Sequence, residues 1–84
     1  MTIYVDPAVW PFRRQLYCHM MTDGDLSELH KFATQIGMKR SWFQPDPRHP
    51  HYDLSPSYRA KAVKAGAIEI EAIEMIRKCV RKQT

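Results

Sequence analysis

The chain has few cysteines and no long hydrophobic run, and each absence excludes a class of protein. Its 84 residues include two cysteines, Cys18 and Cys79, which lie far apart and match no CxxC spacing. We therefore expect two free thiols rather than a disulfide scaffold. No run approaches the roughly 18 apolar residues that span a bilayer, and the first residues do not resemble a signal peptide. These absences predict a cytoplasmic protein with no membrane partner.

Signatures of catalysis are also scarce. The sequence has no nucleophile motif, no glycine-rich phosphate loop and no paired carboxylates at fixed spacing, so it does not favour an enzyme. It has no internal repeat or low-complexity tract, and 84 residues are too few for a second hydrophobic core. A content of 44% hydrophobic residues excludes a disordered chain. We expect one domain over residues 1–84. So small a domain would bury a further face by forming a homodimer.

Charge of one sign is in moderate excess. Thirteen Lys and Arg residues oppose nine Asp and Glu residues, which gives a net charge of +4 and suits an anionic partner. A basic cluster near the C-terminus contributes much of this excess and has two interpretations. It either complements the C-terminal end of a helix or forms a nucleic-acid-binding patch. Its members are Arg77, Lys78, Arg81 and Lys82.

Local patterns predict three strands and three helices. The strands are expected at residues 2–5, 40–44 and 67–70, and residues 7–22 have no period long enough to assign. One helix should follow Asp23 and end at Gly37. A second should begin at Ser55, with Pro56 at its first position, and end at Gly66. A third begins near residue 72, although residues 68–79 also satisfy one continuous helix.

This order predicts an α/β fold in which about three strands form a small parallel or mixed sheet, with three helices in the order βαβαβα. In such sheets ligands bind beyond the carboxyl ends of the strands. The rule would gather Asp6, residues 7–22, Gln44 and the start of the second helix at one edge.

The segment HPHYDLSP contains the most unusual polar pattern. If it is extended, His49, His51 and Asp53 point to one face. The spacing H-x-H-x-D looks like the front of a zinc motif of metallo-β-lactamase-type hydrolases, but Leu54 stands at the sixth position. No cofactor is expected unless a divalent metal binds here. Zinc, manganese or iron would suit a site of His51 and Asp53 with His19 or His30.

The same region can also be interpreted as a ligand pocket. Trp42 and Tyr52 offer flat faces for a ring, and Gln44 can donate to and accept from an adenine-like edge. The first turn of the second helix, with Arg59 after it, is suited to bind a phosphate or carboxylate group. A purely structural interpretation remains for each residue, with Trp42 and Tyr52 in the core, and Asp53 capping the helix at Ser55.

Three longer segments support a family resemblance. With TIYVD, LSELHKFATQIGMKRSWFQ and HYDLSPSYRAKAVKAGAIEI in this order, the chain resembles the DUF4031 family of small bacterial and phage proteins of unknown function. The resemblance implies no activity. Many relatives have a different insert in place of PDPRHP, so little weight falls on Asp46, Arg48 and His49. The resemblance implies that members share a set of polar or aromatic residues at His19, Asp23, His30, Trp42, Gln44, His51, Tyr52 and Asp53.

Together these patterns favour a domain that binds a small anionic, nucleotide-like molecule in order to sequester or sense it. One alternative is a metal-dependent nuclease or phosphodiesterase that uses the histidine and aspartate residues, with metal ligands His19, His51 and Asp53. Another is an accessory module that binds nucleic acid or protein through the basic C-terminal helix. The expected ligand-binding residues are His19, Trp42, Gln44, His51, Tyr52, Asp53 and Arg59.

Overall fold

The computed structural model describes residues 2–7, 10–12 and 14–79, and these form a small α/β domain with a mixed sheet. Its strands are β1 (Ile3–Val5), β2 (Trp10–Phe12), β3 (Gln15–Thr22), β4 (Phe43–Gln44), β5 (His51–Leu54) and β6 (Ile68–Glu69). Its helices are α1 (Leu26–Gln35), α2 (Pro56–Lys64), α3 (Ala72–Cys79) and the 3₁₀ turn η1 (Arg40–Trp42). None of the described helices is both long and apolar enough to cross a membrane.

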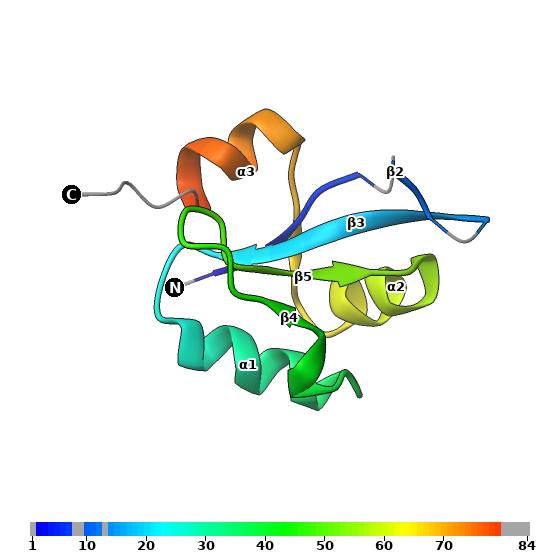
Figure 1. Cartoon of the computed structure of the whole chain (residues 1–84), viewed down its shortest axis with the longest axis horizontal. Helices are drawn as coiled ribbons and strands as arrows, with labels where there is room; N and C mark the ends of the chain where they lie inside the picture. Colours follow the sequence, from blue (N-terminus) through cyan, green and yellow to red (C-terminus); the bar gives the residue numbers. More distant parts are fainter. Residues whose placement is uncertain (1, 8–9, 13, 80–84) are drawn as a thin grey trace.

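The sheet has the order β4-β5-β3-β1-β6, and β2 pairs with the other end of β3. Only β1 and β6 run parallel, whereas the other neighbouring strands run antiparallel. Figure 1 shows α3 on one side of this sheet and both α1 and α2 on the other. We refer to these sides as the α3 face and the α1/α2 face.

Two predictions about the strands were wrong. Residues 7–22 contain β2 and β3, which makes the sheet larger than the expected three strands and changes the element order. The alternation of β3 is hidden because it has buried apolar side chains on both faces, and its hairpin turn uses Arg14 at φ 67° rather than glycine. Residues 40–42 form η1, so only Phe43 and Gln44 of the predicted second strand pair with β5.

The helix ends follow the sequence signals closely. The side chain of Asp25, two residues after the predicted Asp23, caps α1 by accepting a hydrogen bond from the Ser27 N–H. Ser55 caps α2, and Pro56 is its first residue, as predicted. Gly37 and Gly66 both have positive φ, which lets the chain leave each helix in the left-handed conformation. The strand predicted after Gly66 is confirmed as β6, separate from α3.

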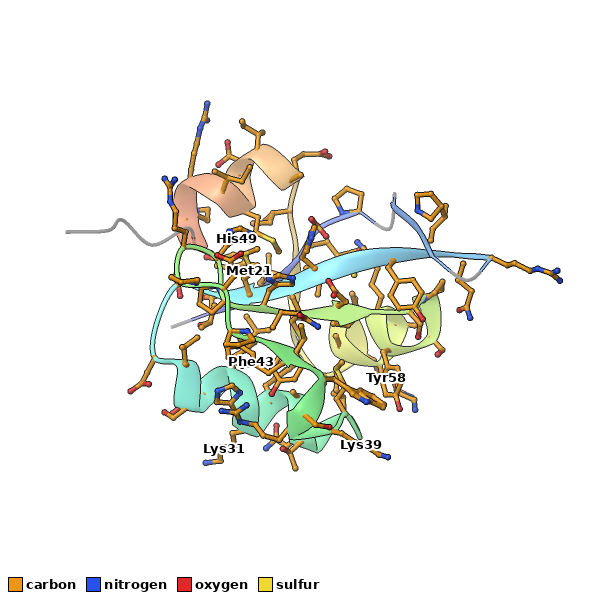
Figure 2. All side chains as sticks on the ribbon, viewed as in Figure 1. Met21, Lys31, Lys39, Phe43, His49 and Tyr58 are labelled. Carbon is orange, nitrogen blue, oxygen red and sulfur yellow. The ribbon has the colours of Figure 1, made fainter. Side chains whose placement is uncertain are left out.

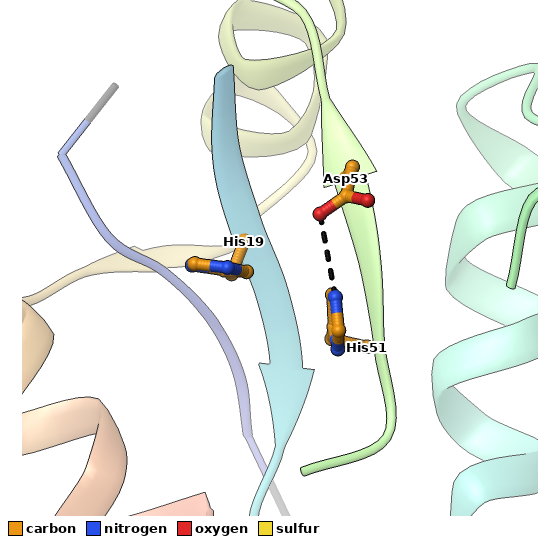
Figure 3. A group of neighbouring side chains, drawn as sticks. All are labelled: His19, His51 and Asp53. Carbon is orange, nitrogen blue, oxygen red and sulfur yellow. Dashed lines mark ion pairs between the residues drawn. The ribbon is translucent and has the colours of Figure 1, made fainter. Parts of the chain in front are cut away.

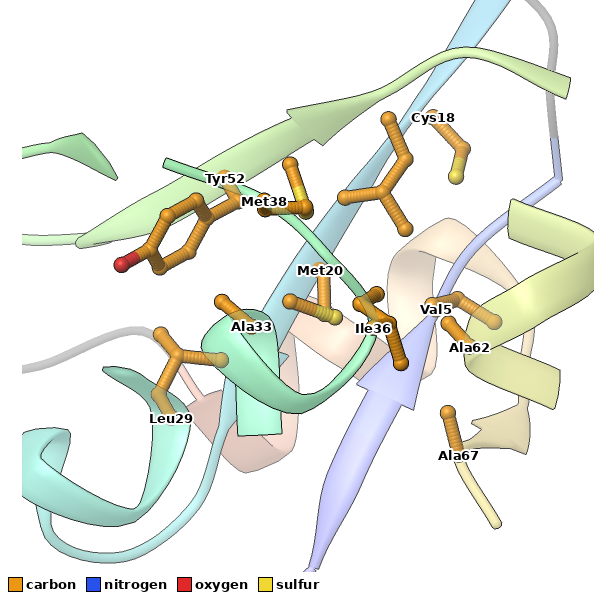
Figure 4. Close-up of a cluster of buried hydrophobic side chains, with 11 residues drawn as sticks. Val5, Cys18, Met20, Leu29, Ala33, Ile36, Met38, Tyr52, Ala62 and Ala67 are labelled. Atoms are coloured by element: carbon orange, nitrogen blue, oxygen red, sulfur yellow. The ribbon is translucent and has the colours of Figure 1, made fainter. Parts of the chain in front are cut away.

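Each face of the sheet carries its own hydrophobic cluster. On the α1/α2 face, fully buried side chains from β1, β3 and β5 pack against α1 and α2 (Figure 4). On the α3 face, a smaller cluster joins Tyr4 and Met21 to Met75 and Cys79 of α3. Figure 2 shows Met21 on the α3 side and Phe43 on the side of α1. The α3 face is therefore covered by apolar packing mainly at one end of the sheet.

Candidate metal centre

Two neighbouring strands place three polar side chains together on the α3 face. His19 of β3 lies opposite Asp53 of β5 in the antiparallel register, and opposed residues project to the same face. His51 precedes Asp53 by two residues and shares that face because side chains alternate along a strand. One potential ligand atom from each residue lies within 4.8 Å of the others (Figure 3). The sequence prediction of His19, His51 and Asp53 as the metal-ligand set thus corresponds to one compact cluster.

Asp6, which directly follows β1, holds His19 in place through two hydrogen bonds. Its carboxylate accepts a hydrogen bond from the backbone N–H of His19 at 2.7 Å and another from the ring Nδ1 at 2.8 Å. Because a carboxylate at neutral pH only accepts, Nδ1 carries the proton and Nε2 carries the lone pair in the neutral ring. A carboxylate behind a histidine is the usual arrangement that orients an imidazole toward a metal.

His51 is oriented in the same sense by a backbone carbonyl. Its Nδ1 lies 2.7 Å from the carbonyl oxygen of His49, which can only accept, so Nδ1 donates and the neutral ring has its lone pair on Nε2. That Nε2 lies 3.3 Å from Oδ1 of Asp53. Two acceptor atoms therefore face each other unless His51 is charged or a cation lies between them.

The contact between His51 and Asp53 Oδ1 is an ion pair if Nε2 carries a proton, and it leaves this oxygen without a partner if the ring is neutral. The atom is buried, and within the described part of the chain it has no hydrogen-bond partner, although His51 is close enough for charge attraction. A buried carboxylate oxygen without a partner is costly and uncommon in native proteins. This oxygen therefore calls for a proton on His51 or a metal ion beside it.

The two possibilities compete for the same position. Burial lowers the pKa of His51, but the neighbouring Asp53 carboxylate and the His49 carbonyl outweigh burial and raise it. The electrostatic field that favours a proton on Nε2 also favours a divalent cation. Two ligands about 2.0–2.1 Å from a tetrahedral ion are about 3.3 Å apart, which matches the separation of His51 Nε2 and Asp53 Oδ1.

Two cavities adjoin the cluster. One, of about 290 Å³, lies between the sheet and α3 and is lined by Asp6 and His19 together with apolar side chains such as Met75. The other, of about 470 Å³, is lined by Asp53 and residues from β3, η1, β4 and α2. The cluster is therefore bordered by open space on its His19 side and on its Asp53 side.

The structure brings together some, but not all, of the residues predicted to bind a ligand. Trp42 and Gln44 line the larger cavity with Asp53, and Gln44 pairs with His51 across β4 and β5. Tyr52 points to the opposite face, where it is fully buried and its hydroxyl lies 2.8 Å from Nδ1 of His30. The structural interpretation of Tyr52 fits this position.

Arg59, which the sequence predicts to bind a phosphate or carboxylate group, contacts other groups of the protein in the structure. Its Nε donates to the backbone carbonyl of Asp6 at 2.9 Å, and its Nη1 contacts the carboxylate of Glu69 at 2.9 Å. These bonds connect α2 to the ends of β1 and β6. Arg59 therefore supports Asp6, and through it His19, from behind the cluster.

The remaining predicted polar residues lie around the cluster or away from it. Asp23 accepts hydrogen bonds from the Thr2 N–H and the Tyr4 hydroxyl at the far end of β3. The His49 ring stacks on that of His51, with centroids 5.5 Å apart, and its Nε2 lies 3.3 Å from Asp46. Arg48 is exposed in the same loop.

Of the basic cluster, Arg77 is paired with Glu74 and Lys78 lies over the Tyr4 ring, whereas residues 81 and 82 are outside the described part of the chain. Both described bases therefore contact other residues of the protein, Arg77 within α3 and Lys78 on β1. Whether they bind nucleic acid stays a prediction.

The sequence did not predict the parts that three residues play at the site. Asp6 was expected at the site edge as a member of an acid–base or metal-assisted site, but its bond to His19 depends on the unrecognised pairing of β1 with β3. Tyr17 and Tyr58 line the larger cavity. The alternation of Tyr17, His19 and Met21 along one face of β3 is the signal that could have placed Tyr17 beside His19.

The cysteine thiols play no part in the cluster. Both cysteines are buried, and Cys18 is a free thiol that points to the α1/α2 face between Tyr17 and His19. Burial, followed by the charge of Asp6, raises the pKa of the Cys18 thiol to about 12. The thiol therefore stays protonated at neutral pH and is a poor ligand or nucleophile.

The fold and the cluster define a class, a small mixed α/β domain with two histidines and one carboxylate converging on a sheet face. The chain belongs to DUF4031, a family described as protein of unknown function, whose model matches residues 3–82. Comparison with curated proteins and with solved structures gives no match.

Proposed function

We propose that this protein binds a divalent transition metal through His19, His51 and Asp53 and uses it to hydrolyse a phosphate ester. The observation that carries the proposal is the buried Asp53 Oδ1, which has no hydrogen-bond partner among the described residues and lies 3.3 Å from His51 Nε2, the nitrogen that carries the lone pair when the ring is neutral. Two imidazoles and a carboxylate suit zinc, manganese or iron.

The donor set leaves coordination positions for water and substrate, as catalytic metal sites require. A metal held there would lower the pKa of a bound water and polarise a substrate oxygen. In the hydrolysis, the water oxygen forms a bond to phosphorus, the bond to the leaving oxygen breaks, and a water proton passes to that oxygen. Asp6 and the His49 carbonyl would hold both imidazoles with Nε2 toward the metal. The net charge of +4 favours an anionic substrate.

Metal titration followed by calorimetry tests the first half of the proposal. The unmodified protein should bind one Zn²⁺ or Mn²⁺ per chain, and His51→Ala and Asp53→Asn should abolish binding. Asp6→Asn should weaken affinity about 10- to 100-fold because it removes a support of His19 rather than a ligand. His30→Asn is the matched control, since His30 lies on the opposite face, bonded to Tyr52. Binding that survives in His51→Ala would refute the site.

Hydrolysis of bis(4-nitrophenyl) phosphate by the metal-loaded protein tests the second half. Turnover should require the metal and should disappear in Asp53→Asn, while His30→Asn retains it. Metal binding without any turnover would leave the metal site standing and remove the hydrolytic function.

A further inference from the structure

We propose that the cavity beside Asp53 binds the base of a mononucleotide, whose phosphate reaches the His19–His51–Asp53 cluster. This assignment of substrate class rests on the metal centre proposed above. The cavity has a volume of about 470 Å³, within the range of about 300–1,000 Å³ that is typical of small-molecule sites. Its walls combine three aromatic rings with a small number of polar groups, as sites for planar ligands do.

The location of the cavity follows from the shortness of β4. This strand contributes only Phe43 and Gln44, which pair with Tyr52 and His51, so β4 ends before Asp53. The residues just before β4 form η1 instead of lengthening the strand, and the cavity occupies the edge of the sheet beside Asp53. Because Asp53 belongs both to this cavity and to the cluster, a ligand in the cavity would place its adjoining group at the metal.

Trp42 provides an aromatic surface in this cavity. Its side chain is 38% exposed, yet it packs against the Tyr58 ring at 5.6 Å between centroids in an edge arrangement. The Tyr58 hydroxyl in turn reaches the Gly37 carbonyl. A large exposed aromatic side chain that is held in place and lines a cavity is suited to stacking on a base.

Gln44 provides the polar recognition group. Its side chain is exposed at the cavity, and within the described residues its amide makes no hydrogen bond. An amide offers one acceptor and two donors, which match the N6 and N7 edge of adenine. A wholly apolar ligand would leave the Gln44 amide without a partner, whereas the adenine of a nucleotide would satisfy it.

Fluorescence of Trp42 provides a direct test. The chain has two tryptophans, so Trp10→Phe leaves Trp42 as the single reporter. With Zn²⁺ bound, adenosine monophosphate should quench this fluorescence, and inorganic phosphate should bind without quenching. Gln44→Ala should weaken nucleotide binding about tenfold and leave Zn²⁺ affinity unchanged. Gln35→Ala, at an exposed position of α1, is the matched control.

The outcomes separate this inference from the proposed function. Zn²⁺ binding with no effect of adenosine monophosphate on Trp42 would overturn the nucleotide assignment and leave the metal centre intact. Equal nucleotide affinity with and without Zn²⁺ would overturn the link between the cavity and the metal. Tighter binding of a single-stranded oligonucleotide than of the mononucleotide would overturn the mononucleotide in favour of a nucleic acid.

Discussion

Along β5 the two faces of the sheet have different chemistry, although each face carries a hydrophobic cluster elsewhere. Along β5, Tyr52 and Leu54 are fully buried on the α1/α2 face, whereas His51 and Asp53 meet His19 on the α3 face. On the first face the Tyr52 hydroxyl has His30 as its hydrogen-bond partner. On the second face, Oδ1 of Asp53 has no hydrogen-bond partner among the described residues. The alternation of a single strand thus separates the residues that stabilise the fold from those available for chemistry.

The largest expected effect is the loss of stability when the buried face is truncated. Tyr52→Ala removes a fully buried aromatic ring and should lower the free energy of unfolding by about 3–5 kcal/mol. Asp53→Ala, one residue away on the other face, should change it little or raise it, because it removes a buried atom without a hydrogen bond. Urea unfolding of both variants measures the contrast. Equal destabilisation would contradict the division between the faces.

A smaller effect should come from a polar contact on the α1/α2 face, the hydrogen bond between Tyr52 and His30. Tyr52→Phe retains the ring but leaves Nδ1 of His30 without its partner, and should cost about 0.5–1.5 kcal/mol. Tyr58→Phe is the control, because the Tyr58 hydroxyl makes an exposed contact of 3.5 Å to a carbonyl and should contribute almost nothing. If the two variants unfold at the same urea concentration, the Tyr52–His30 bond does not stabilise the fold.

The smallest effect concerns the pH dependence of this link. Burial, followed by the charge of Arg40, lowers the pKa of His30 below its ordinary value near 6.5. As pH falls through 6.5 the unfolded chain gains a proton at His30 before the folded chain does, so the contribution of neutral His30 is present above pH 6.5 and declines below it. Comparing urea midpoints of the unmodified protein and His30→Asn from pH 7 to 5 isolates this term. A stability difference that grows as the pH falls would show the opposite shift.

Sequence reasoning succeeded where a signal was local. The caps at Ser55 and Gly37, the spacing of apolar residues in α1 and the alternation of His51 and Asp53 depend only on neighbouring residues, and the structure contains each of them. It failed at β3, because His19 lies between Cys18 and Met20 in a strand with buried residues on both faces.

Pairings between distant strands could not be predicted in the same way. The bond from Asp6 to His19 and the register of His19 opposite Asp53 require the positions of β1, β3 and β5 in the sheet. The sequence therefore predicted which three residues lie together in the cluster, but not the geometry that orients them. The rule that places ligands beyond the carboxyl ends of strands did not apply, since β3 and β5 are antiparallel and the cluster lies on a sheet face.

The most direct test of the metal centre is long-range ¹H–¹⁵N NMR of the histidine rings before and after addition of Zn²⁺. We expect His19 and His51 to retain the Nδ1 proton throughout, and their Nε2 resonances to change on metal binding, while those of His30 stay constant. Coordination through Nδ1 of either residue, or Zn²⁺ binding that leaves both Nε2 resonances unchanged, would contradict the account.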